Sequence, residues 1–150
     1  MKSLLISLAT VSLVLIGCSD TSTSPAPTYY MYADVNGDRF NADALHASVD
    51  DDYISIIGAN SKGAQIEIKL KDTDIQEFDL GSDTYNSAYF VLGDEPSSRY
   101  ETKFHIGEGR VVITRRVSTE IMGFFYFNGV NADSNVVQIQ RGNFRIRLQP

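Results

Sequence analysis

The sequence predicts an all-β fold, namely an antiparallel β-sandwich of about eight to ten strands, with a lipocalin-like closed β-barrel as the alternative. Three observations favour this class. Apolar and polar residues alternate with a period of two along much of the chain, as they do in half-buried strands. Turn signals rich in glycine, aspartate and asparagine recur at roughly the spacing of strands. Only Ala42–Ser48 could form even a short helical turn.

The chain begins with an export signal, predicted over residues 1–17. The basic residue Lys2 precedes an apolar run from Leu4 to Ile16 that is too short to cross a bilayer. The run closes with Leu15-Ile16-Gly17-Cys18, which resembles the lipobox of bacterial lipoproteins. That resemblance implies cleavage before Cys18, attachment of diacylglycerol and a fatty acyl chain such as palmitate, and anchoring as an outer membrane lipoprotein of the cell envelope. The alternative is an ordinary secreted protein.

A linker and one domain are expected to follow the signal. Residues 18–28 are rich in serine, threonine and proline and show no apolar period, which indicates an extended linker. Residues 29–150 are enough for a single β domain with its own core. Cys18 is the only cysteine, so the domain has no internal disulfide and no thiol for metal or nucleophilic chemistry.

The segment ADVNGDRF opens the domain and allows two interpretations. Asp34, Asn36 and Asp38 have the spacing of the first three ligands of an EF-hand-type calcium loop. However, the sixth position of such a loop is glycine and the twelfth is a carboxylate, whereas this chain has Arg39 and Leu45 there. We therefore expect no metal site in this segment.

The second interpretation is a β-hairpin with Asn36 and Gly37 as its two-residue type I′ turn. This turn places the apolar residues of both strands on one face and the polar ones on the other. The predicted pairs are Val35 with Asp38, Asp34 with Arg39, Ala33 with Phe40, Tyr32 with Asn41 and Met31 with Ala42. The agreement of turn residues with alternation favours the hairpin.

Three later segments alternate clearly and are predicted as strands. They are Gln65–Lys71, which should bury Ile66, Ile68 and Leu70; Arg99–Ile106, which should bury Tyr100, Thr102, Phe104 and Ile106; and Asn143–Leu148, which should bury Phe144, Ile146 and Leu148. The runs Tyr53–Ala59 and Ile121–Val130 are apolar on both faces, as in central strands or strands whose outer face meets a partner. Gly142 separates two runs of opposite parity, so a bulge or tight turn is expected there.

Candidate catalytic groups are few. The histidines are His46 and His105, and a hydrolase built on His46, Ser48 and Asp50 would need them to converge. No nucleophile elbow accompanies them, and neighbours on one strand do not supply the geometry of acyl transfer. We therefore expect surface histidines, no catalytic residues and no enzyme. The run of aspartates at residues 50–52 reads as a solvated turn, or as a calcium site only if distant ligands converge on it. No cofactor motif is present.

Charge is distributed unevenly along the chain. The net charge is −6, which argues against nucleic acid as a partner. Residues 19–109 carry six basic and seventeen acidic residues, whereas residues 110–150 carry six arginines and two acidic residues. We expect these arginines to form cross-strand ion pairs, with an anion-binding face as the alternative.

Aromatic residues are the best candidates for a binding surface. They gather in three places, Tyr29, Tyr30 and Tyr32; Tyr85 and Tyr89; and Phe124 and Tyr126. Exposed tyrosines on a sheet suit stacking against sugars or contact with a protein, because they supply area at a low entropic cost. The alternative is that they cover the edges of the core.

Several segments match a known family in their order along the chain: residues 33–37 with Phe40, and residues 56–58, 66–70, 100–102, 109–114, 123–127 and 138–144. In these segments the chain resembles an uncharacterised β-rich lipoprotein family of bacteroidete-type bacteria, domain of unknown function 6252. Phe124 stands where the family usually has threonine, and Phe40 where it often has tryptophan. The resemblance implies an envelope location and an all-β domain, and it supplies no catalytic residue.

Together these features predict a non-catalytic, lipid-anchored envelope lipoprotein that is a binding or accessory module for a glycan or a protein partner. One alternative is a carrier of a small apolar ligand, with a barrel cavity lined by Phe125 and Phe127. A structural envelope component and a hydrolase are less expected alternatives.

Overall fold

The structure, a computed structural model, describes residues 28–50, 52–71, 74–81, 85–93, 95–103 and 105–149. These residues form eleven β-strands, one short 3-10 helix and no α-helix, so the prediction of an all-β fold is confirmed. The strands are β1 (Tyr30–Val35), β2 (Asp38–Asn41), β3 (Ala44–Asp50), β4 (Tyr53–Ala59), β5 (Ala64–Lys71), β6 (Glu77–Leu80), β7 (Ser87–Leu92), β8 (Arg99–Thr102), β9 (Glu108–Val117), β10 (Glu120–Val130) and β11 (Val136–Gln149), and the helix is η1 (Pro96–Ser98). The helical turn considered at Ala42–Ser48 is absent, because most of this segment lies in β3.

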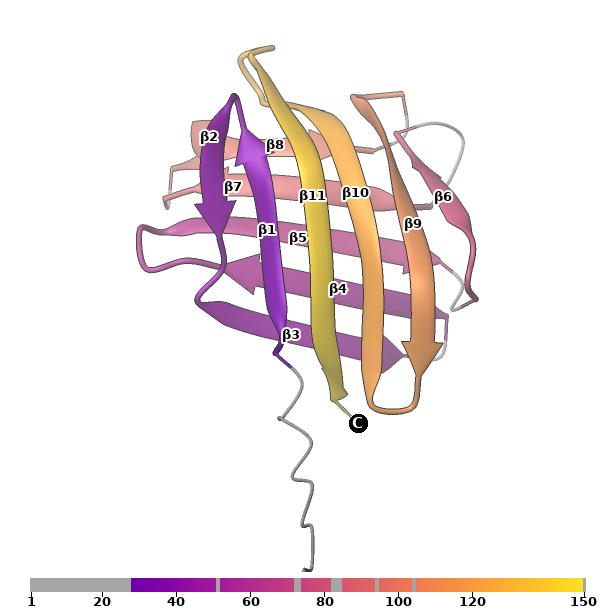
Figure 1. The fold of residues 1–150 in the computed structure, drawn as a ribbon. Coiled ribbons are helices and arrows are strands. Elements are labelled where there is room, and N and C mark those ends of the chain that lie inside the picture. Colours follow the sequence, from indigo (N-terminus) through magenta and orange to yellow (C-terminus); the bar gives the residue numbers. More distant parts are fainter. Residues whose placement is uncertain are drawn as a thin grey trace, which may run out of the picture.

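The strands are arranged in two layers that face each other, with the strands of one crossing those of the other (Figure 1). The front layer has the order β2-β1-β11-β10-β9-β6, and the back layer has the order β3-β4-β5-β7-β8. Two pairings join the layers into one sheet of eleven strands: β11 pairs in parallel with β3 at Leu148 and Ala47, and β10 pairs with β8 at Val130 and Glu101. The described strands outnumber the expected eight to ten, and three of them, β2, β6 and β8, have only four residues each.

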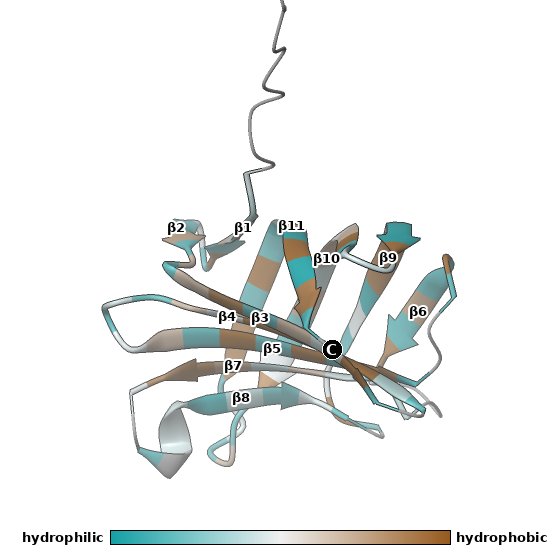
Figure 2. Ribbon diagram, turned by 90° about the horizontal axis from the view of Figure 1, so that it is seen from below, coloured by the Kyte–Doolittle hydropathy of each residue, from teal (hydrophilic) through white to brown (hydrophobic). Residues whose placement is uncertain are grey.

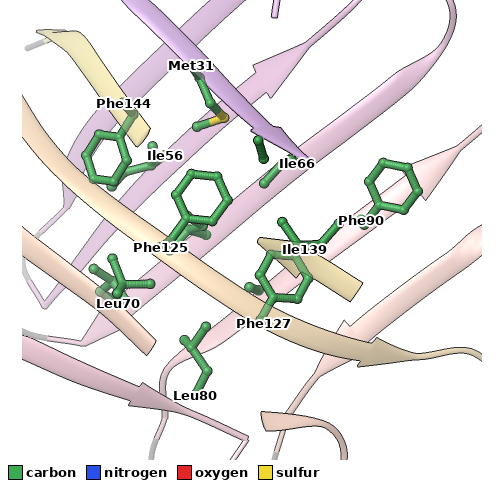
Figure 3. Close-up of a cluster of buried hydrophobic side chains, with 14 of the residues drawn as sticks. Met31, Ile56, Ile66, Leu70, Leu80, Phe90, Phe125, Phe127, Ile139 and Phe144 are labelled. Atoms are coloured by element: carbon green, nitrogen blue, oxygen red, sulfur yellow. The ribbon is translucent and has the colours of Figure 1, made fainter. Parts of the chain in front are cut away.

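The hydrophobic core lies between the two layers. Along strands such as β11, hydrophobic and hydrophilic residues alternate, so that one set faces the opposite layer (Figure 2). The predicted inward residues of β5, Ile66, Ile68 and Leu70, are fully buried. From the front layer, Phe125 packs with Phe127 and Phe144, with ring centroids 6.4 Å and 6.2 Å away (Figure 3).

The β1–β2 hairpin has the register predicted from the sequence. Val35 pairs with Asp38, Asp34 with Arg39, Ala33 with Phe40 and Tyr32 with Asn41, and the amide of Ala42 donates a hydrogen bond to the carbonyl of Met31. Asn36 and Gly37 have φ angles of 50° and 92°. Positive φ at both central residues is the requirement of a type I′ turn. The Asn36 side chain also accepts a hydrogen bond from the amide of Gln138, which ties the turn to β11.

A β-bulge occurs on β11 next to Gly142, as the change of parity predicted. On β10 the pairing moves from Phe125–Gly142 to Phe127–Ile139, which leaves one extra residue on β11. Arg141 there has a φ angle of 50°. A Cβ atom on Gly142 would lie 2.6 Å from the ring of Phe125, so this position requires glycine. The bulge lets the residues on both of its sides point into the core and turns Arg141 outward.

One predicted strand is shorter than expected. The alternation at Arg99–Ile106 suggested a continuous strand, but β8 ends at Thr102. Lys103 and Ile106 form an isolated bridge around a turn in which His105 has a φ angle of 59°. Ile106 is therefore 38 % exposed rather than buried, and His105 lies outside the strand. Thr102 is fully buried, as expected, and Phe104 lies outside the described residues.

Several predictions concern residues that the structure does not describe. The signal at residues 1–17, Cys18 and nearly all of the linker at residues 18–28 lie outside the described residues. Within the part of the chain that is described, no helix has the length and apolar character needed to cross a membrane.

Candidate functional site

The carboxylate of Asp34 is held by arginines. Its Oδ1 accepts a hydrogen bond of 3.2 Å from Nη1 of Arg39, and its Oδ2 forms an ion pair with Arg141. Burial tends to raise the pKa of Asp34, but the hydrogen bonds and positive charges of Arg39 and Arg141 together outweigh it, so the pKa lies below its ordinary value. The oxygens that a calcium loop would direct at an ion are thus engaged with guanidinium groups. Asp38 points to solvent at the turn.

The two histidines lie in different parts of the fold. His46 is on β3, paired with Ile57 of β4, and Ser48 and Asp50 follow on the same strand. Successive residues on one face of a strand are about 6.6 Å apart, so these three side chains form a row rather than a convergent triad. His105 lies in the turn after β8. Among the described residues, which include Asp50 and Asp52, no three histidine, cysteine or acidic side chains form a possible metal site.

Among the described residues, the two most exposed aromatic side chains that belong to strands lie on the outer surface of the front layer. On β10, Phe124 is 44 % exposed and Tyr126 is 50 % exposed. Phe124 pairs with Asn143 of β11, and Asn143 pairs with Tyr32 of β1. We name this surface the aromatic face; it consists of Tyr30, Tyr32, Val112, Met122, Phe124, Tyr126 and Asn143.

The register fixes the spacing of this face. Tyr32 and Phe124 are separated by the single strand β11, which places their backbones about 10 Å apart, with Asn143 between them. The rings of Tyr30 and Tyr32 are stacked with centroids 5.6 Å apart, and the guanidinium of Arg39 covers Tyr32 at 3.9 Å. Phe124 and Tyr126 therefore provide the open part of the face, and the tyrosines of β1 form its border.

Charged residues around the aromatic face form ion pairs with one another. Glu120, whose side chain is 7 % exposed, pairs with Arg115 at 3.1 Å and with Arg145 at 2.8 Å. Arg110 pairs with Glu77 at 2.9 Å and with Asp79 at 3.1 Å. The carboxylates of Asp79 and Glu77 raise the pKa of Arg110. The prediction that the arginines of the last third of the chain form cross-strand ion pairs is confirmed for these residues.

The opposite surface, on the back layer, contains the other tyrosines. Tyr85 is 71 % exposed, and Tyr89 lies on β7 near Tyr53 of β4. Each ring is covered by a cation: Lys71 over Tyr85, Arg99 over Tyr89 and Lys69 over Tyr53, at 4.3, 4.0 and 4.6 Å. Tyr53 and the lysines were not singled out from the sequence. Alternation alone would have placed them on an outer face, but their proximity depends on the pairing of β4, β5 and β7.

The fold and these surfaces define a small all-β domain whose candidate sites lie on open sheet faces. The chain belongs to the family described as domain of unknown function 6252 (DUF6252), whose model matches residues 28–146. The resemblance recognised from the strand and turn segments is thereby confirmed at the level of the family. Searches of curated proteins and of solved structures found no match.

Proposed function

We propose that the protein is a non-catalytic envelope lipoprotein, anchored through Cys18, that binds an uncharged glycan on its aromatic face. The anchoring rests on the lipobox-like residues 15–18 and on the linker that follows them. The family match, which begins at residue 28, covers the part of the chain that would carry the binding activity.

The observation that carries the proposal is the exposure of Phe124 and Tyr126 in the middle of a sheet. A large aromatic side chain in such a position leaves apolar area in water, which a flat partner can cover. The apolar face of a sugar ring fits a planar aromatic surface of this kind. Asn143, beside Phe124, adds an amide that can donate to and accept from hydroxyl groups.

The pairing of the surrounding charges favours an uncharged ligand. A ligand that covers this face removes water from its rim, and an unpaired charge there would lose hydration without compensation. Here the carboxylates of Asp34 and Glu120 are already each paired with two arginines. Covering the face therefore leaves neither of these carboxylates without a partner.

The core favours this surface site over the carrier alternative. That alternative needs a cavity beside Phe125 and Phe127. Both side chains are 1 % exposed, and the ring of Phe125 packs on those of Phe127 and Phe144. Side chains thus occupy the space in which an apolar ligand would be carried.

The test is binding of the full lipidated protein, purified in detergent, to an array of neutral polysaccharides. We expect the wild type to bind, and the double variant Phe124→Ala/Tyr126→Ala to lose about tenfold or more in affinity, since each aromatic contact contributes about 0.5 to 1.5 kcal/mol. Tyr85→Ala, which removes an exposed aromatic ring from the opposite surface, is the matched control and should bind as the wild type does.

Thermal unfolding of each variant checks that the fold is retained. Equal binding by the wild type and the double variant would contradict the assignment of the aromatic face. Capture of a protein partner without any neutral glycan would contradict the ligand class and favour the protein-binding alternative.

A further inference from the structure

The outer face of the back layer contains a hollow of about 320 Å³ between β4, β5 and β7. Lys69 lies at its centre, since it pairs with Ser55 of β4 on one side and with Ser87 of β7 on the other. Tyr53 and Tyr89 border the hollow, and Lys103 reaches it from the segment after β8. These strands lie behind the front layer in Figure 1, so the hollow is separate from the aromatic face.

Lys69, in the hollow, and Lys71, which lies beside it over Tyr85, differ from three arginines of the front layer in their partners. Arg110, Arg115 and Arg145 each contact a carboxylate. Among the described residues, by contrast, neither Lys69 nor Lys71 forms an ion pair. Both side chains are exposed and lie over tyrosine rings, Lys69 at 4.6 Å from Tyr53 and Lys71 at 4.3 Å from Tyr85.

None of the described carboxylates on this face forms an ion pair with these two lysines. Asp50 of β3 pairs across strands with Tyr53, which in turn pairs with Lys71. Glu67 precedes Lys69 by two residues on the same face of β5 and pairs across strands with Tyr89. Glu101, beyond Tyr89 on β8, forms an ion pair with Lys103 and lies 4.0 Å from Arg99. In a protein with a net charge of −6, the two ammonium groups are therefore a local concentration of positive charge without carboxylate partners among the described residues.

This combination has a defined recognition chemistry. An ammonium group binds a carboxylate or sulfate through charge-assisted hydrogen bonds, and a tyrosine whose ring is covered by that cation still offers its hydroxyl group to a sugar. We propose that the hollow around Lys69 binds an anionic sugar, carboxylated or sulfated, with its charged group between Lys69 and Lys71 and its hydroxyl groups toward those of the neighbouring tyrosines. This site does not depend on the proposed function of the aromatic face.

The experiment compares three probes on the full lipidated protein in detergent: a polygalacturonate oligosaccharide, dextran sulfate and uncharged dextran. We expect at least one anionic probe to bind and uncharged dextran to bind at least tenfold more weakly at this site. Binding only to polygalacturonate would support a carboxylated ligand, and binding only to dextran sulfate would support a sulfated ligand. Binding to both would support a site that recognises the negative charge of either group. Failure of both anionic probes to bind would overturn the proposal.

The variant Lys69→Gln/Lys71→Gln should lower the affinity for the bound anionic probe at least tenfold. Lys62→Gln removes an exposed lysine from the β4–β5 turn and is the matched control. An equal loss of affinity in Lys62→Gln would overturn the proposal, because it would indicate general electrostatic attraction to the protein surface. Unchanged affinity in the double variant would overturn it as well, because the two lysines would then not form the site. Phe124→Ala/Tyr126→Ala should leave anionic binding unchanged, so failure at one surface is distinguishable from failure at the other.

Discussion

At the scale of single residues, Asp34 has the sequence position of a calcium ligand but forms ion pairs in the structure. In the sequence it occupies the first ligand position of a partial calcium loop. In the fold it is the centre of an ion-pair cluster with Arg39 and Arg141. Arg39 was predictable from the hairpin register. Arg141 was not, because it is brought to Asp34 by the long-range pairing of β1 with β11 and by the bulge next to it.

Asp34 should make the stability of the protein depend on pH in the acid range. Its pKa is lowered in the folded state, whereas in the unfolded chain an aspartate titrates near about 3.9. The stability that Asp34 contributes is therefore fully present above that unfolded value and is lost as the pH falls through the folded pKa. We expect Asp34→Asn to be less stable than the wild type at neutral pH and to lose less stability on acidification.

Denaturant unfolding at a series of pH values between about 7 and 2 measures this difference. Asp38→Asn, which changes an exposed aspartate of the same hairpin, is the control and should follow the wild type. The Asp34→Asn variant should still show some pH dependence, because backbone and side-chain hydrogen bonds from Ser61 also lower the pKa of Asp43. Parallel curves for the wild type and Asp34→Asn would contradict the assigned role.

At the scale of elements, local sequence patterns predicted several strands, one turn and one bulge that the structure contains. The alternation of Ile66, Ile68 and Leu70 predicted β5, and the Asn36-Gly37 dipeptide predicted the β1–β2 register. The parity change at Gly142 predicted the bulge. The pattern failed at Ile106, because a turn with positive φ at His105 interrupts an alternation that looks continuous in the sequence.

The β1–β2 turn gives a direct test at this scale. Gly37 has a φ angle of 92° and no neighbouring heavy atom within 4 Å of the position of a Cβ atom, so backbone conformation rather than space limits this site. We expect Gly37→Val to lower the free energy of unfolding by about 1 to 3 kcal/mol, because a β-branched residue resists positive φ.

Gly37→Asn is the matched variant, since asparagine adopts positive φ more readily, and it should cost clearly less than valine. Chemical denaturation of both variants beside the wild type measures the difference. If valine and asparagine were equally well tolerated, positive φ would not be a requirement at this position.

The candidate sites were only partly accessible to sequence reasoning. The second apolar face of Ile121–Val130 indicated that Phe124 and Tyr126 would point away from the core, and both do. The charge pairs of Glu120 and the arrangement of Tyr53 with Lys69 join residues on different strands. Such contacts depend on strand order, which a pattern with a period of two does not encode.

At the scale of the whole molecule, the two layers present surfaces of different character. The front layer exposes aromatic side chains among charges that pair with one another. The back layer exposes tyrosines beneath Lys69 and Lys71, which have no carboxylate partner among the described residues. The strand order could not be predicted, because the parallel β11–β3 pairing and the β10–β8 contact join segments that are distant in the chain.

The proposed anchor belongs to this scale, because it determines where the whole domain resides. We expect the wild type to fractionate with membranes and to incorporate labelled palmitate, since two or more acyl chains hold a protein stably in a bilayer. Cys18→Ser should lose the label and appear in the soluble fraction. Ser19→Ala, at the next position, is the control and should remain with the membranes. Wild-type protein that is soluble and carries a free thiol would contradict the lipoprotein assignment.

The first and last described residues of the chain lie at the same end of the molecule, where Tyr29 and Gln149 border one open hollow. The β1–β2 and β10–β11 turns lie together at the other end (Figure 1). A reporter fused after Pro150 would therefore begin at the end of the domain to which the linker, and in an anchored protein the bilayer, is attached. An epitope inserted in either turn would project away from it and would be the better choice for detecting on which side of the membrane the domain is displayed.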